Sequence, residues 1–143
     1  MDMYRVDPVA LAQSYNIEVI GTPFIEVDGS IEKKDTKVVL TYNTNSHPNR
    51  QRFTVAHELG HFIAGHLDGT KKMFRDQSKN FTIDNYDIQE VEANKIAAQI
   101  LMPQETVKHL IEDIGISTIE ELANILDVST GAMHYRLKNL GII

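Results

Sequence analysis

The chain has 143 residues, of which 42% are hydrophobic, and its formal net charge is −6. This length is enough for one compact domain that buries about two thirds of the surface exposed by the unfolded chain. The absence of cysteine excludes disulfides, thiol catalysis and cysteine metal ligands. The negative charge is spread without long blocks of one sign, so it gives no electrostatic basis for nucleic-acid binding.

The N-terminal segment predicts a helix and no targeting signal. MDMYRVDPVA lacks the basic-then-apolar pattern of a signal peptide, and no apolar run in the chain approaches the roughly 18 residues that span a bilayer. We therefore expect a cytoplasmic protein without a membrane partner. Residues 7–15 predict a first helix, with Asp7 as the N-cap and Pro8 at the first helical position.

A strand-rich stretch follows this helix. Residues 24–27 and 37–42 are short runs of β-branched and aromatic residues. Asp28-Gly29 is a turn dipeptide between them, which predicts a hairpin or a meander. His47 lies in the polar sequence NTNSHPN, and we expect it to be a surface loop residue.

The pentapeptide HELGH at 57–61 carries the most specific chemistry in the chain. His57 and His61 are four residues apart, so in a helix they project from one face and can bind the same metal ion. Glu58 then lies beside the ion, where a general base is needed. The stretch 52–66 is rich in apolar residues and free of proline, which predicts a buried helix. Gly60 has no side chain, so another element, such as a strand, can approach closely there.

A catalytic zinc site has three protein ligands and one open position, so a third ligand is expected downstream. His66 does not match the long motif HExxHxxGxxH, which places a glycine three residues and a histidine six residues after the second histidine. Here Gly65 and His66 come at four and five. We therefore predict that His66 is a residue of the helix end and not a ligand.

Glu90 and Glu92 are the other candidates, and both lie in EVEANKIAAQILMP, which predicts a second helix ending before or at Pro103. Residues two apart in a helix point some 200° away from each other, so only one of the two can face the ion. Glu90 shares its face with Ala93, Asn94 and Ala97, a strip of small residues along which the metal-bearing helix could approach closely. The amide of Asn94 can also bond the far ring nitrogen of a ligand histidine. Glu90 is the preferred ligand, and Glu92 is the alternative.

Residues 71–89 have mixed polarity and no clear period, which predicts a long linker between the two motif helices. This linker contains three aromatic residues: Phe74, Phe81 and Tyr86. We expect their side chains to pack against one another within the loop, and contact with substrate is the alternative.

The C-terminal third predicts two helices arranged like a helix-turn-helix. Ser117-Thr-Ile-Glu120 is a capping-box pattern that opens a helix to about Leu126, and Ser129 caps a second helix that ends near Gly141. The first turns of the second helix carry few groups that read bases: Thr130, Gly131, Ala132 and His134. From Ile116 onward, the chain has two basic residues and three acidic ones, so phosphate is not attracted and we expect no direct nucleic-acid binding.

Together, RFTVAHELGH, EVEANKIAAQILMP and VSTGAMHYRLKNLGI resemble the ImmA/IrrE family of bacterial and phage metallopeptidases. The resemblance covers nearly the whole chain, including DPVALAQSYNIEV near the N-terminus. It implies an α+β fold, namely a small zincin-like domain with a short β-sheet, a metal-binding helix pair and a C-terminal helix-turn-helix-like region. We expect a single metallopeptidase domain over 1–143, with a zincin-like core at 1–103 and a helical subregion at 104–143.

The resemblance also implies the chemistry. His57, His61 and Glu90 would hold one Zn²⁺ per chain, with Mn²⁺ as the alternative metal, and Glu58 would be the catalytic base of zinc-assisted peptide hydrolysis. His134 and Tyr135 are candidates for a second oxyanion donor if the last helix folds back over the cleft. The expected substrate is a helix-turn-helix repressor encoded nearby. The alternative is a metal-containing regulator that binds a repressor without cutting it.

Overall fold

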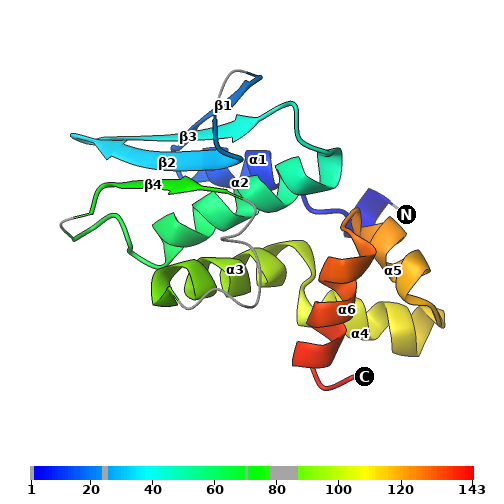
Figure 1. Cartoon of the computed structure of the whole chain (residues 1–143). Coiled ribbons are helices and arrows are strands. Elements are labelled where there is room, and N and C mark those ends of the chain that lie inside the picture. Colours follow the sequence, from blue (N-terminus) through cyan, green and yellow to red (C-terminus); the bar gives the residue numbers. More distant parts are fainter. Residues whose placement is uncertain (1, 24–25, 70, 78–86) are drawn as a thin grey trace. The chain divides into compact units, whose positions relative to one another are not determined.

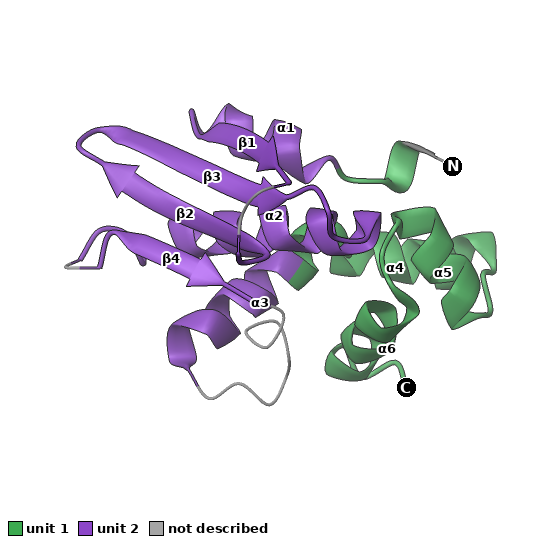
Figure 2. Ribbon diagram, turned by 45° about the horizontal axis from the view of Figure 1, so that its top comes forward, with its two compact units in different colours: residues 1–6, 98–143 green, residues 7–97 purple. Residues whose placement is uncertain are grey.

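The computed structural model describes residues 2–23, 26–69, 71–77 and 87–143. The chain divides into two compact units (Figure 2): unit 2 is Asp7–Ala97, and unit 1 is Met1–Val6 together with Ala98–Ile143. Helices and strands are both well represented, and the sheet is mixed, so the α+β prediction is confirmed.

Unit 2 is built on a sheet with the strand order β1-β3-β2-β4 (Figure 1). The strands are β1 (Glu18–Thr22), β2 (Gly29–Lys34), β3 (Lys37–Asn43) and β4 (Met73–Asp76). β1 runs parallel to β3, whereas β2 is antiparallel to both of its neighbours. Ile31 and Leu40 face each other across β2 and β3, and both are fully buried in the core.

The structure confirms β3 and corrects the other strand predictions. Gly29 begins β2 and is not part of a hairpin turn; the β2–β3 turn is at Asp35, which has a φ of 55°. Of the strand predicted at 24–27, residues 26–27 form a bend and 24–25 lie outside the described residues. β4 lies within the stretch predicted to be a linker without secondary structure. Its four residues form a strand because they pair with β2.

Two helices of unit 2 pack against each other. α1 (Pro8–Ser14) begins as predicted, since the Asp7 carboxylate accepts hydrogen bonds from the N–H groups of Val9 and Ala10, with Pro8 at the first helical position. α2 (Pro48–Ile63) packs on β2 and β3 and contacts α1, where the rings of Tyr15 and Phe62 meet edge to face.

α2 begins and ends earlier than the sequence prediction of 52–66. Pro48 occupies the first turn, and Nδ1 of His47 accepts a hydrogen bond from the N–H of Asn49, so His47 is the N-cap of the helix. At the other end, Gly65 has a φ of 79°, a left-handed conformation that terminates the helix and turns the chain back.

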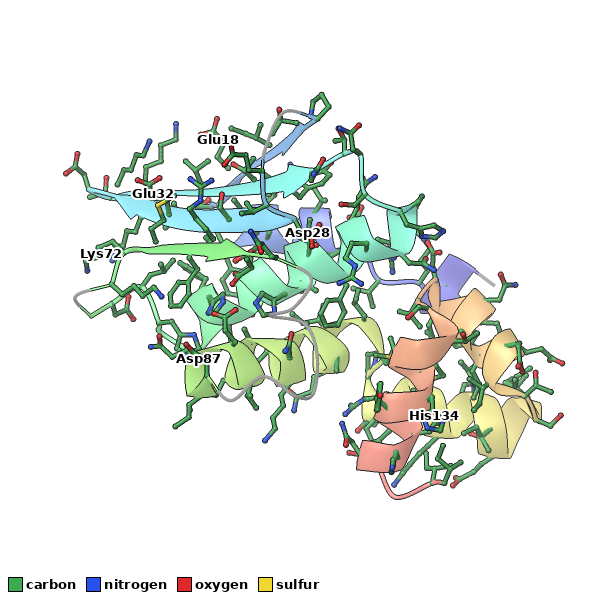
Figure 3. The ribbon with its side chains drawn as sticks, viewed as in Figure 1. Glu18, Asp28, Glu32, Lys72, Asp87 and His134 are labelled. Carbon is green, nitrogen blue, oxygen red and sulfur yellow. The ribbon has the colours of Figure 1, made fainter. Side chains whose placement is uncertain are left out.

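α3 (Ile88–Leu101) ends before Pro103, as predicted, and starts two residues before Glu90. Asp87, labelled in Figure 3, lies just ahead of it and accepts hydrogen bonds from the N–H groups of Gln89 and Glu90. The acidic cap fixes the first turn of α3, which is the turn that carries Glu90.

Unit 1 is helical. Its described elements are η1 (Asp2–Tyr4), α4 (Gln104–His109), the π-helical turn η3 (Leu110–Ile114), α5 (Ile119–Leu126) and α6 (Thr130–Asn139). Ser129 caps α6 as predicted, by accepting from the N–H of Ala132. The cap of α5 is Thr118 and not Ser117, because Thr118 has the extended conformation and accepts from the N–H of Glu121. Arg136 of α6 donates from Nε to the carbonyl of Met102 at 2.8 Å.

No helix among the described residues combines the length and the apolar character needed to cross a membrane.

Gly60 is expected to be intolerant of any side chain. A Cβ built there lies 2.7 Å from the carbonyl oxygen of Ala93 on α3, which is backbone and cannot swing away. Gly60→Ala should therefore lower the free energy of unfolding by about 1–3 kcal/mol, although alanine is the better helix former. The matched control is Gly131→Ala in α6, where a Cβ meets nothing closer than 3.9 Å. This control should instead gain about 0.5–1 kcal/mol. Chemical denaturation measures both, and equal effects would show that the α2–α3 spacing is not tight.

Candidate metal centre

His57 and His61 lie one turn apart on α2 with both side chains fully buried. Their rings are 4.8 Å apart between centroids, as the four-residue spacing requires. Nε2 of His57 lies 3.0 Å from Oε1 of Glu90, and Nε2 of His61 lies 3.1 Å from Oε2 of the same carboxylate. The two imidazoles thus converge on one carboxylate from α3.

The close approach of α2 and α3 places Glu90 at this point. Gly60 lies directly against the backbone of Ala93, and Ala93 and Ala97 are both fully buried. The strip of small residues that follows Glu90 is therefore a contact surface for the histidine helix, as the sequence indicated. The element that uses the space at Gly60 is helix α3, whereas the sequence suggested a strand.

A second carboxylate, Asp76, was missed by the sequence analysis. It is the last residue of β4, its side chain is 1% exposed, and its Oδ2 lies 3.5 Å from Nε2 of His57 and 3.3 Å from Nε2 of His61. No local pattern indicated it, since DQSKN reads as a polar turn. Its place in the cluster depends on the long-range pairing of β4 with β2.

The separations within the cluster suit a metal ion. Four residues offer one donor atom each within 4.8 Å of one another, and all are buried: His57, His61, Asp76 and Glu90. Zinc bonds to nitrogen or oxygen of about 2.0–2.2 Å would separate tetrahedral donor atoms by roughly 3.3–3.6 Å. The nitrogen-to-carboxylate separations of 3.0–3.5 Å are close to that value. These four residues could hold a metal.

The hydrogen bond to Asn94 supports the same reading. Nδ1 of His57 lies 2.7 Å from Oδ1 of Asn94, the bond predicted from the sequence. Since an amide oxygen only accepts, Nδ1 carries the proton in the neutral ring and Nε2 turns its lone pair toward the carboxylates. A lone pair facing carboxylate oxygens is unfavourable unless a cation or a further proton lies between them.

The charges of the cluster shift the pKa values of His57 and Asp76. Burial opposes protonation of His57, but the carboxylates of Asp76 and Glu90 outweigh it and raise the His57 pKa. Burial likewise opposes ionisation of Asp76, yet its hydrogen bonds, first among them the one with His57, hold the Asp76 pKa far below the ordinary value. Both shifts show that the cluster favours positive charge next to its carboxylates.

Glu58 lies beside the cluster and not within it. Its side chain is fully buried and is absent from the group of converging donor atoms. A Cβ at Gly29 would lie 3.1 Å from Oε2 of Glu58, so the bare backbone of β2 leaves room for the carboxyl. Burial raises the Glu58 pKa well above its ordinary value, and the charges of Asp76 and Glu90 raise it further. A nearby divalent cation would oppose these effects and favour the carboxylate.

His66 is a residue of the helix end, as expected, but it is also buried and contacts the cluster. After the turn at Gly65, its Nδ1 lies 2.9 Å from Nδ1 of His61. On its other side, Nε2 lies 3.5 Å from Oε1 of Glu92, whose side chain is 52% exposed. Glu92 therefore contacts His66 and does not join the four converging residues. The sequence analysis missed this contact, because it depends on the left-handed turn at Gly65.

The two proposed oxyanion donors lie elsewhere in the chain. His134 and Tyr135 are exposed residues of α6 in unit 1, whereas the buried cluster belongs to unit 2. Their role stays a prediction.

Comparison with known proteins identifies the family of this chain. A family model described as the IrrE N-terminal-like domain matches residues 12–138, which include both motif helices. This chain belongs to that family. The family resemblance stated from the motifs is thereby confirmed.

Two relatives carry the name radiation response metalloprotease IrrE. The protein from Deinococcus radiodurans is 30% identical over 112 residues, which are 77% of this chain and 33% of the relative. The protein from Deinococcus deserti is 30% identical over 118 residues, which are 80% of this chain and 40% of the relative. The chain therefore spans roughly a third to two fifths of the length of these relatives.

Proposed function

We propose that this chain is a zinc-dependent endopeptidase that cleaves a specific protein in the cytoplasm, namely a helix-turn-helix repressor encoded nearby. The observation that carries the proposal is the buried cluster of two helix-borne histidines and Glu90, with the carboxyl of Glu58 beside it. The name of the two relatives, metalloprotease, supports the same reaction class.

In this proposal the residues of the cluster have separate roles. His57, His61 and Glu90 would hold the ion, and Asn94 orients His57. Bound zinc would supply Lewis-acid polarisation of the peptide carbonyl and a lowered pKa for the attacking water. Glu58 would accept the proton of that water and pass it to the departing amine.

The sheet offers a means of holding an extended substrate. β4 lies at one end of the strand order, and within the described residues it pairs only with β2. A substrate segment could add to this edge by main-chain hydrogen bonds, which require few particular side chains. β4 also carries Asp76, so a substrate paired there would lie next to the histidines.

Co-expression with the repressors encoded next to this gene tests the proposal. Wild type should cut one repressor at a single region and leave casein intact, and fragments are detected on gels. Relief of repression with the repressor intact would contradict cleavage, and would favour the alternative of a metal-containing regulator that acts by binding. The proposal places no nucleic acid among the direct partners, since α6 offers few groups that read bases.

A further inference from the structure

Asp76 occupies the same kind of position around the two histidines as Glu90. Its Oδ2 lies 3.5 Å and 3.3 Å from the Nε2 atoms of His57 and His61. Glu90 lies 3.0 Å and 3.1 Å from the same two nitrogens. Any ion that His57, His61 and Glu90 share is therefore also within reach of Asp76.

The fold holds Asp76 in this position from two sides. Its carbonyl accepts a hydrogen bond from the N–H of Asp28 at 2.9 Å, and its Cα is in register with Gly29 of β2. Phe74, two residues earlier, is on the same face of β4 and stacks on the His61 ring, with centroids 3.8 Å apart. The strand that carries Asp76 is thus packed directly on a histidine of the cluster.

A buried carboxylate is costly unless it is hydrogen-bonded, paired with a positive charge or bound to a cation. Asp76 is 1% exposed and shares a small volume with Glu90 and Glu58, which are buried too. Asp76 and Glu90 supply two converging carboxylates, one more than a site of two histidines and one glutamate requires. Four protein ligands are typical of closed, structural zinc sites, whereas catalytic sites leave one position open.

We propose that Asp76 is a fourth protein ligand that closes the coordination position which peptide hydrolysis requires. This inference rests on the proposed function, and it makes the folded chain a resting form of the enzyme. For Glu58 to act on a substrate, the Asp76 carboxylate would have to leave the ion. Because Asp76 is the last residue of the edge strand β4, the movement that opens the site would be confined to that end of the strand.

The test uses the full chain loaded with Co²⁺, whose visible spectrum reports coordination, and acetohydroxamate, a small ligand that needs an open position. Wild type should show a four-coordinate spectrum that acetohydroxamate changes little. Asp76→Ala should bind acetohydroxamate at least about tenfold more tightly. The same variant should lose metal affinity by roughly ten- to a hundredfold or more, measured by competition with a chelator. The matched control is Asp68→Asn, at a carboxylate whose side chain is 77% exposed, and it should behave as wild type.

A displaceable ligand predicts that Asp76→Ala raises the affinity for acetohydroxamate and lowers the affinity for the metal. If Asp76 were purely structural, its removal would not increase access to the ion. Wild type that binds acetohydroxamate as tightly as Asp76→Ala, or a variant that keeps wild-type metal affinity, would overturn the inference and leave the peptidase proposal standing. Failure of wild type to take up Co²⁺ or Zn²⁺ would overturn both. If Asp76→Ala does not fold, the wild-type titration decides alone: a full spectral change on adding acetohydroxamate means that the position is open.

Discussion

Glu58→Gln is expected to abolish cleavage of the repressor while the fold and the metal content stay nearly unchanged. Glutamine has almost the same size as glutamate, so it fits the buried space beside Gly29, but it cannot accept the proton of the attacking water. Proton transfer of this kind is worth roughly a hundred to ten thousand fold in rate. A cleavage complete within minutes would then not be seen within a day. Gel detection of fragments, with metal content measured on the same preparation, gives both readouts.

The control for this prediction is Glu105→Gln, at an exposed residue of α4, which should cut at the wild-type rate. A Glu58→Gln chain that cuts normally would remove Glu58 from the mechanism. A Glu58→Gln chain that relieves repression as well as wild type, with the repressor intact, would mean that the protein acts by binding.

Glu90→Gln should weaken metal retention far more than Glu92→Gln. The Glu90 carboxylate lies within 3.1 Å of both histidine Nε2 atoms, whereas the half-exposed Glu92 contacts His66. Loss of a charged ligand should cost well over tenfold in affinity, while loss of the outer contact through His66 should cost about tenfold at most. Dialysis against a weak chelator followed by elemental analysis ranks the two variants. The reverse ranking would move the third ligand to Glu92.

The sequence predicted the parts of the site that depend on local geometry. His57 and His61 must share a helix face at a spacing of four, and the small residues after Glu90 predict a face on which another helix packs closely. The structure shows both features, together with the bond between Asn94 and His57. Helical periodicity makes such relations readable from a single sequence.

The parts that depend on long-range pairing were not predicted. β4 has four residues and takes its conformation from β2, so Asp76 could not be placed near the histidines from its neighbours in the sequence. β1 was missed for a similar reason: most of its residues are exposed, and its parallel partner β3 lies some twenty residues later. The turn at Gly65 returns His66 to His61, a contact that spacing alone does not show.

The central claim is that His57, His61 and Glu90 form a metal site in this chain. Elemental analysis of the purified protein, after removal of loosely bound ions, tests it most directly. We expect close to one zinc per chain, or one manganese if that is the metal in the cell, and loss of this ion in Glu90→Gln. Protein that is essentially free of metal and also fails to take up added zinc would contradict the claim, and with it the proposed peptidase chemistry.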